Sequence, residues 1–261
     1  MNEDLRIKIV ELIYNAKEGH IPSSLSIIDI INHIYTKFLK LDKKNKNKND
    51  YFILSKGHGC VALYVVLNKM KIISDYVLSK YSTNGSLLGG HPDSTKIPEI
   101  VASTGSLGHG FPMAVGIALG LKIKKDNNKK VFVLLGDGEC QEGTIWESAN
   151  IAANRNLNNL FAIVDWNQSA AQLMPMDNLE KKWLAFGWDV KIINGHSKID
   201  FEKYLNNKSL NNLHRPKVFL AKTIKGKGIP FMEGHGIWHH KMPNEEQFMQ
   251  IMEILKKSEI K

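Results

Sequence analysis

Two continuous apolar runs in the middle of the chain form its clearest structural pattern. Residues 131–135 (VFVLL) and 160–164 (LFAIV) contain no polar position. Such runs are typical of parallel strands that helices cover on both faces. Residues 141–154 lie between them and have the length of a crossover helix, so this stretch predicts a strand, a helix and a second, parallel strand.

Helix-like and strand-like patterns alternate along the rest of the chain. Leu5 and Ile9 begin a helical spacing of apolar residues. A second helix is predicted over residues 25–38, with Ser23 or Ser24 as its cap. Further elements are predicted at 51–54 (strand), 55–59 (glycine turn) with a helix after it that ends near residue 70, 108–122 (helix), 178–186 (helix), 188–192 (strand), 218–221 (strand) and from 244 onward (helix).

This alternation predicts an α/β fold with a parallel sheet flanked by helices. No linker rich in proline or glycine divides the pattern, so residues 1–261 are expected to form one domain. Of these residues 43% are hydrophobic and 23% are charged, which is the profile of a chain that folds around a core.

Membrane, export and disulfide signals are missing from the sequence. No run of about eighteen apolar residues occurs, and the N-terminal residues lack the apolar core of a signal peptide. The two cysteines, Cys60 and Cys140, lie far apart and outside any CxxC spacing, which argues against a disulfide framework or a thiolate zinc site. A cytoplasmic protein without a membrane partner is therefore expected.

The net charge of +9 has a simple origin. Only three of the 35 basic residues are arginines, and many lysines stand beside asparagines, as in KKNKNKND at residues 43–50. That stretch is typical of a solvated loop. Basic stripes interleaved with aromatic residues are absent, so no nucleic-acid partner is expected.

Candidate ligands for a metal ion follow the two central runs. Asp137, between two glycines, comes directly after the first run, and Asn167 comes after the second. The carboxyl ends of parallel strands meet at one edge of a sheet, where ligands bind. With a nearby main-chain carbonyl, these side chains make an oxygen set suited to Mg²⁺ or Ca²⁺. The glycines and the start of a helix near Gln141 would favour a phosphate.

A resemblance to a known family becomes specific at these residues. GDGECQEG from Gly136, with 28 residues from Glu139 to Trp166 before Asn167, resembles the thiamine diphosphate motif. Six further segments stand in order: GHIPSSLS from Gly19, ILSKGHG from Ile53, GGHPD from Gly89, ASTGSLGHG from Ala102, KTIKGKG from Lys222 and FMEGHGIWHHKMPN from Phe231. Together they resemble the diphosphate-binding half of a transketolase, particularly the N-terminal chain of split, two-gene transketolases.

The resemblance implies a thiamine diphosphate-binding fold with thiamine diphosphate and Mg²⁺ as cofactors. It implies that Asp137, Asn167 and the main-chain oxygen of Ser169 hold the ion and that Gly138 offers its N–H to a phosphate. Further cofactor contacts are implied for His58, Gly105, Ser106, Leu107, Gly108, Glu139 and His239.

The resemblance also assigns catalytic residues. His20, His58, His91 and His239 match the family's active-site histidines. A ketose loses a hydroxyl proton as its C2–C3 bond breaks, and imidazole titrates near neutral pH. His20 and His239 are expected near the substrate hydroxyls and the phosphate end of the cofactor, and the other two near the reacting carbons. Glu142 matches a glutamate at a subunit interface, and it also suits the start of a helix.

His235, His239 and His240 have a spacing that also occurs in zinc sites. No carboxylate or thiolate partner accompanies them, and the nearby glycines favour a loop, so zinc is not expected there. His235 and His240 are therefore interpreted as bystanders.

The resemblance implies that the active site is incomplete in this chain. In transketolases a glutamate of a separate pyrimidine-binding domain engages the far ring of the cofactor, and this sequence ends at Lys261 before such a domain. A second chain is expected to supply that domain, in a heterotetramer or a similar even-numbered complex.

The substrate and some rival functions stay open at this point. Residues 21–23 and 168–176 and His109 depart from the family pattern near the expected cleft, so a sugar, a sugar phosphate or a nucleotide-linked sugar all fit. Rivals are a deoxyxylulose phosphate synthase, a 2-oxoacid dehydrogenase alpha chain and a non-catalytic structural partner. The WHHKMP segment favours transketolase. A dinucleotide-binding loop is disfavoured because Met113 stands where its third glycine would be.

Overall fold

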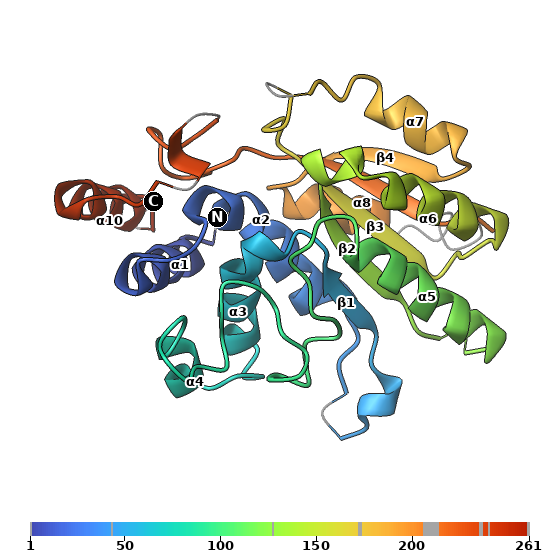
Figure 1. The fold of residues 1–261 in the computed structure, drawn as a ribbon, viewed down its shortest axis with the longest axis horizontal. Coiled ribbons are helices and arrows are strands. Elements are labelled where there is room, and N and C mark those ends of the chain that lie inside the picture. Colours follow the sequence, from blue (N-terminus) through green and yellow to red (C-terminus); the bar gives the residue numbers. More distant parts are fainter. Residues whose placement is uncertain are drawn as a thin grey trace.

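Five parallel strands form the centre of the computed structural model (Figure 1). It describes residues 2–42, 44–126, 128–171, 174–205, 214–234, 237–239 and 241–259. The strands are β1 (Tyr51–Leu54), β2 (Val131–Gly136), β3 (Leu160–Trp166), β4 (Asp189–Asn194) and β5 (Lys217–Lys222). Their order across the sheet is β1-β2-β3-β5-β4, and each neighbouring pair is parallel. The predicted fold class is confirmed.

The apolar runs lack alternation because both faces of the sheet are buried. Along β2, Phe132 and Leu134 point into one core cluster, whereas Val133 and Leu135 point into the other. Successive side chains of a strand alternate between faces, so a strand covered on both sides needs an apolar residue at every position.

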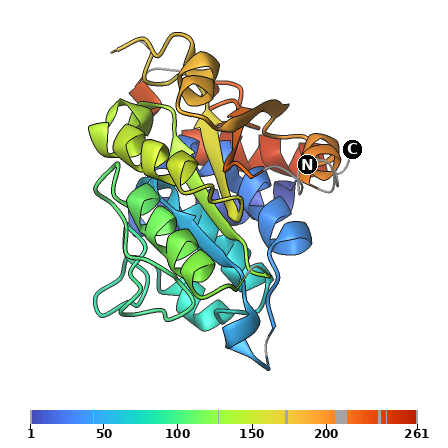
Figure 2. The same ribbon diagram turned by 90° about the vertical axis from the view of Figure 1, so that its right-hand side faces the viewer.

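Helices cover these two faces. The first face carries α2 (Ile21–His33), α3 (Cys60–Lys69) and α8 (Lys198–Leu205), with α1 (Glu3–Ala16) packed on α2 and α3, and the second carries α5 (Gly110–Ile123), α6 (Gly143–Asn154) and α7 (Leu179–Ala185). The short α4 (Asp75–Ser79) follows α3. Helix α10 (Glu245–Glu259) lies beside α1 in both ribbon views (Figures 1 and 2), with the rings of Tyr14 and Phe248 stacked 3.9 Å apart.

Short helical turns complete the chain between these elements. They are a π-helical turn at Ile34–Phe38 and 3₁₀ turns at Lys46–Lys48, Gly57–Gly59, Gly138–Gln141 and Ile237–His239. The turns at Gly57–Gly59 and Gly138–Gln141 follow β1 and β2, so they lie at the carboxyl edge of the sheet.

The start of α2 differs from the prediction. The helix begins at Ile21, with His20 at the N-cap position, and the N–H of Ser24 already donates to the His20 carbonyl at 3.0 Å. Neither Ser23 nor Ser24 caps it. Pro22 explains the difference, because proline lacks an N–H and its fixed φ suits the first turn of a helix.

Helices α4 and α8 were not predicted. Helix α4 has only five residues, and in α8 Phe201 is the one buried residue that the structure describes. Such short or mostly polar helices give little periodic signal. No helix in the described part of the chain is long and apolar enough to cross a membrane. Cys60 and Cys140 are buried free thiols.

Candidate active site

The ends of β2 and β3 meet at the carboxyl edge of the sheet, as the sequence predicts. Gly136 pairs with Asp165, and the N–H of Asp137 donates to the Asp165 carbonyl at 3.2 Å. The carboxylate of Asp137 accepts the N–H of Gln168 at 2.5 Å and that of Gly138 at 2.7 Å. The predicted acid therefore touches the loop that starts at Asn167.

Asp165 is a buried hub beneath this edge, and the sequence analysis missed it. Its side chain is fully buried and lies 2.5 Å from the ammonium of Lys56. The hydroxyls of Ser26, at 2.6 Å, and of Thr223 donate to the same carboxylate. Burial by itself raises the pKa of Asp165, but Lys56 and these hydrogen bonds outweigh it and lower the pKa.

Asp165 also orients the amide of Asn167. The Asn167 Nδ2 donates to Asp165 at 2.9 Å, which turns Oδ1 away from that carboxylate. The Oδ1 atom accepts the N–H of Ser169 at 2.9 Å. An oxygen acceptor, rather than an amide N–H, is therefore presented toward the loop of residues 167–169.

The donor set fits a divalent cation. Burial, followed by the nearby negative charge of Asp165, raises the pKa of Asp137 to about 6. A cation beside Asp137 would offset both effects, and carboxylate, amide and carbonyl oxygens are the ligands that Mg²⁺ and Ca²⁺ prefer. A Cβ atom on Gly138 would lie 3.0 Å from the Cβ of Ala170, so the two loops already approach closely at this glycine.

The segment of residues 105–108 is fixed next to the same edge. Gly108 has φ +81°, and a Cβ there would lie 2.5 Å from the Thr144 hydroxyl, so the position requires glycine. Its N–H donates to Glu139 at 3.0 Å. Glu139 also accepts the N–H of Gly136 at 3.1 Å and the hydroxyl of Ser55. Burial raises the pKa of Glu139, and its described hydrogen bonds tie these loops together.

Three of the four predicted histidines form one cluster. The ring centroid of His20 lies 5.3 Å from that of His58 and 5.5 Å from that of His239, and the last two are 6.1 Å apart. They come from the start of α2, the turn after β1 and the turn at Ile237–His239. Burial, helped by the charge of Lys56, lowers the pKa of His58 to about 2, which keeps its ring neutral.

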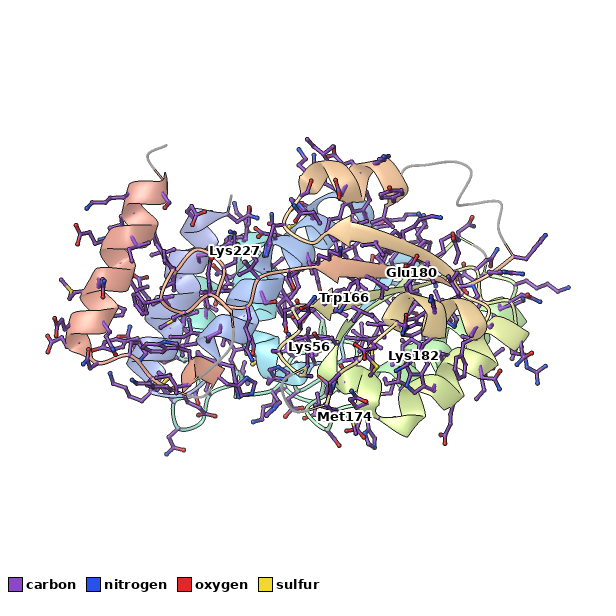
Figure 3. All side chains as sticks on the ribbon, turned by 90° about the horizontal axis from the view of Figure 1, so that it is seen from above. Lys56, Trp166, Met174, Glu180, Lys182 and Lys227 are labelled. Carbon is purple, nitrogen blue, oxygen red and sulfur yellow. The ribbon has the colours of Figure 1, made fainter. Side chains whose placement is uncertain are left out.

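Lys225 joins this cluster, and it too was missed. Its ammonium lies 2.6 Å from Nδ1 of His239. Burial, then the charge of Lys56, lowers the pKa of Lys225 to about 8. Seen from above, Lys56 and Trp166 lie in the middle of the molecule, between α1 and α10 on one side and α5 and α6 on the other (Figure 3). The site therefore occupies the centre of the sheet edge.

His91 lies against the segment of residues 105–108. A Cβ atom on Gly105 would lie 3.0 Å from the His91 ring, and one on Gly57 would lie 2.9 Å from the Gly105 nitrogen. Tyr64 holds the loop by donating to the His91 carbonyl at 2.8 Å. Gly105 therefore stands between exposed His91 and the turn that carries His58.

The remaining predicted positions lie around this centre. Ser106 and Glu142 are exposed, and Leu107 is half-buried. Glu142 is the N-cap residue of α6 and lies beside Gly108, where a Cβ would be 2.8 Å from its own. The position therefore agrees with both interpretations of Glu142, a helix-start acid and a residue at an exposed interface.

The departures from the family pattern adjoin the site. The Pro22 carbonyl accepts the N–H of Gly226 at 3.0 Å, which ties the start of α2 to the loop carrying Lys225. His109 is exposed at the start of α5. Of the divergent stretch 168–176, residues 172 and 173 lie outside the described residues, as do His235 and His240. Within the part that is described, no group of three or more His, Cys, Asp or Glu could hold a metal ion.

This geometry defines an α/β protein with a ligand site at the carboxyl edge of its central strands. The family model for the thiamine diphosphate binding domain of transketolase matches residues 1–256. The chain therefore belongs to the transketolase N-terminal family. This match confirms the predicted family and the predicted cofactor, thiamine diphosphate. The relatives described below are transketolases, which are ketol-transferring transferases.

Relatives of similar length are named as subunits. One subunit of the apulose-4-phosphate transketolase of Phocaeicola vulgatus is 37% identical over 95% of this chain and 89% of its own length. A 6-deoxy-6-sulfo-D-fructose transketolase subunit of Clostridium sp. is 35% identical over 92% of this chain and 89% of its own. The word subunit in these names implies that each of these transketolases contains a second chain.

Longer transketolases match over less than half of their own length. Human transketolase is 34% identical over 95% of this chain, which spans 40% of that protein. The crystal structure of Campylobacter jejuni transketolase superposes with a TM-score of 0.84 at 26% identity, over 97% of this chain and 41% of that chain.

We predict that mild acid destabilises the protein partly through His58. The pKa of His58 is far below its ordinary value in the fold, so the unfolded chain binds a proton that the folded chain does not as the pH falls below about 6.5. The contribution of neutral His58 to the free energy of unfolding is fully present above that pH. It decreases as the pH falls toward about 2.

Urea unfolding at about pH 7.5 and about pH 5 measures this effect. The His58→Gln variant should lose less stability between the two pH values than the unsubstituted protein. Exposed His109→Gln should behave like the unsubstituted protein. Equal losses with and without His58 would contradict the prediction.

Proposed function

We propose that this chain is the diphosphate-binding subunit of a two-chain, thiamine diphosphate- and Mg²⁺-dependent transketolase. One observation carries the proposal. Asp137 lies at one sheet edge with Asn167, whose amide presents its oxygen to the loop of residues 167–169. Both lie next to a cluster of three histidines and two lysines. Relatives that match over nearly their whole length are named as transketolase subunits.

Asp137, Asn167 and the main-chain oxygen of Ser169 would hold Mg²⁺, and the N–H of Gly138 would donate to a phosphate. When bound, thiamine diphosphate supplies the thiazolium carbon that carries the two-carbon unit from donor to acceptor. The segment of residues 105–108 would pack along the cofactor, and Gly105 and Gly108 let it pack closely on His91, Thr144 and Glu142. Glu139 would hold that segment in place through its hydrogen bond to Gly108.

The histidines divide the work on the sugar. The Lys225 ammonium donates to Nδ1 of His239, which places the proton of the neutral ring on Nε2, and His239 would contact a substrate hydroxyl. His20 would meet the same end of the substrate. His58 stays neutral and would orient a hydroxyl by hydrogen bonding near the reacting carbons. His91, which lies against the segment of residues 105–108, would accept the proton that a substrate hydroxyl loses.

A second polypeptide would complete the site. It would carry the pyrimidine-binding domain and its glutamate, in a heterotetramer or a similar even-numbered complex, and exposed Glu142 would lie at the contact between the two chains. We further propose that residues 1–261 form one domain and that the protein acts in the cytoplasm, where its two buried thiols would stay reduced.

The proposed substrate is a ketose with an anionic group. The two relatives described above are named for a phosphorylated and a sulfonated sugar. In this chain the charge of Lys56 is paired with Asp165, whereas Lys225 places a cationic group beside the histidines, and its burial strengthens its attraction for an anion. A sugar phosphate or a nucleotide-linked sugar meets this requirement better than a neutral sugar.

Cofactor binding tests the metal ligands directly. The Asp137→Ala variant, co-purified with its partner chain, should lose detectable binding of thiamine diphosphate in the presence of Mg²⁺, because the ion loses its one charged ligand from this chain. Isothermal titration calorimetry measures this. The matched control is Asp126→Ala, which removes an acid at the opposite edge of the sheet and should leave binding unchanged. Retained binding in Asp137→Ala would refute the assignment of the metal site.

Turnover tests the split active site. We expect the purified chain alone, with thiamine diphosphate and Mg²⁺, to show no ketol transfer from a phosphorylated ketose, because the glutamate is supplied by the partner. Adding the partner should restore activity in proportion to the complex formed. Robust turnover by the chain alone would show that the active site does not need a second chain.

A further inference from the structure

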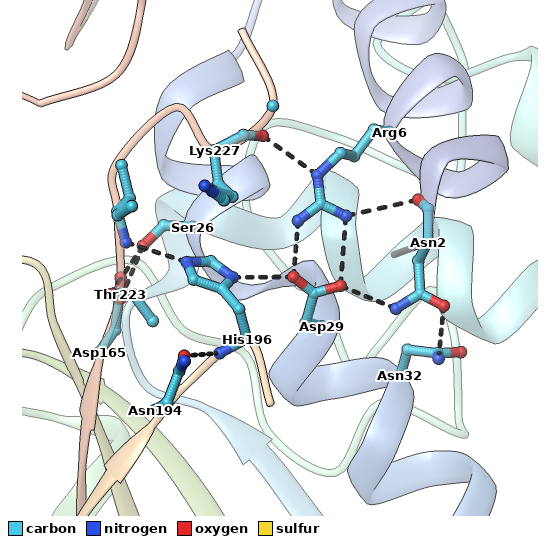
Figure 4. Close-up of polar contacts among 12 residues, drawn as sticks. Asn2, Arg6, Ser26, Asp29, Asn32, Asp165, Asn194, His196, Thr223 and Lys227 are labelled. Atoms are coloured by element: carbon cyan, nitrogen blue, oxygen red, sulfur yellow. Dashed lines mark hydrogen bonds and ion pairs between the residues drawn. The ribbon is translucent and has the colours of Figure 1, made fainter. Parts of the chain in front are cut away.

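A buried ion pair connects the two N-terminal helices. Arg6 of α1 faces Asp29 of α2, with its Nη2 and Nη1 atoms 2.6 and 3.2 Å from the two carboxylate oxygens (Figure 4). The side chains are 0% and 2% exposed. Burial by itself raises the pKa of Asp29, but hydrogen bonds from His196 and Arg6 hold it well below its usual value. Buried charges cost several kcal/mol unless they are paired in this way.

His196 extends this pair toward the active site. Its Nδ1 atom lies 2.8 Å from the Asp29 carboxylate, and its Nε2 atom accepts the N–H of Ile224 at 3.0 Å (Figure 4). Because Nε2 is the acceptor, the proton of the neutral ring sits on Nδ1 and donates to Asp29. The ring therefore bridges a buried acid and the main chain of the loop that follows β5.

The same ion pair holds the other end of that loop. The Nε of Arg6 donates to the Lys227 carbonyl at 3.1 Å (Figure 4). Gly228 has φ +100°, and a Cβ there would lie 3.1 Å from the Arg6 side chain. Ile224 and Lys227 are thus attached to one rigid, buried pair, and Lys225 lies between the two attachments.

Two side chains of the segment of residues 223–227 belong to the active site. Lys225 reaches Nδ1 of His239 at 2.6 Å, and Thr223, one residue before the first attachment, donates to Asp165. The Arg6, Asp29 and His196 network holds this segment through the N–H of Ile224 and the carbonyl of Lys227. The route from His196 to Lys225 therefore runs through the main chain of residues 223–227.

We propose that His196 is a positioning residue that, braced by the Arg6–Asp29 pair, sets the place of the segment carrying Lys225. The functional part of this inference rests on the proposed function. The link that matters is the hydrogen bond from Ile224 N–H to His196 Nε2, whereas the bond to Asp29 orients the ring. A positioning role therefore requires the bond to Ile224 more than the bond to Asp29, whereas a purely structural role would require both bonds equally.

Two amide substitutions separate the two bonds. In His196→Gln the side-chain amide reaches as far as Nε2 and keeps an acceptor for Ile224, and in His196→Asn it ends near Nδ1 and keeps only the donor to Asp29. The first readout is hydrogen exchange of residues 222–229 in the complex with the partner, without cofactor. We expect exchange there to be ~10-fold faster in the Asn variant and close to unsubstituted in the Gln variant.

The second readout is the dissociation constant for thiamine diphosphate at saturating Mg²⁺. It should rise ~10-fold in His196→Asn, the size usual for residues that orient ligand-holding groups, and change little in His196→Gln. Combining His196→Asn with Lys225→Met should add no loss beyond that of Lys225→Met alone, because His196 acts through that segment.

Several outcomes would overturn the proposal. They are an Asn variant whose exchange rate and dissociation constant are no higher than those of the Gln variant, an Asn and a Gln variant that both match the unsubstituted protein, and losses that add in the double variant. If the unsubstituted complex bound no thiamine diphosphate, the proposed function would fail, and the exchange experiment would still decide whether His196 positions the segment.

Discussion

The buried ion pair between Lys56 and Asp165 is the interaction on which the site depends. Lys56 follows β1, and Asp165 lies near the end of β3, two strands away across the sheet. Ser26 of α2 and Thr223 after β5 donate to the same carboxylate, so one acid gathers four separate parts of the chain. Removing either charge would leave the other buried without its opposite charge, which is strongly destabilising.

This pair also gives the two sides of the site opposite electrostatic potentials. Asp165 turns the amide of Asn167 and adds negative potential beside Asp137, which favours a cation on that side. Burial, helped by the charge of Lys56, lowers the pKa values of His58 and Lys225 on the other side, so His58 stays neutral beside fixed positive charge. A site with a cation pocket next to cationic side chains suits a diphosphate bound together with a metal ion.

Local and short-range features of this protein were predictable from its sequence. Uninterrupted apolar runs gave the parallel strands, and the positions of Asp137 and Asn167 after them gave the shared edge. Asp165 was not predictable, because its role comes from contacts with residues more than a hundred positions away, such as Ser26 and Lys56. A polar residue closing an apolar strand was its only local signal. Lys225 and Lys56 stood inside quoted motifs, but their burial beside histidines appears only in the fold.

The most direct test of the central claim is the position of the metal ion. A crystal of the chain with its partner, thiamine diphosphate and Mn²⁺ in place of Mg²⁺ would show the ion by its anomalous scattering. The account predicts one peak in contact with the carboxylate of Asp137, the amide oxygen of Asn167 and the carbonyl of Ser169. A peak elsewhere, with these three oxygens bound to no ion, would contradict it.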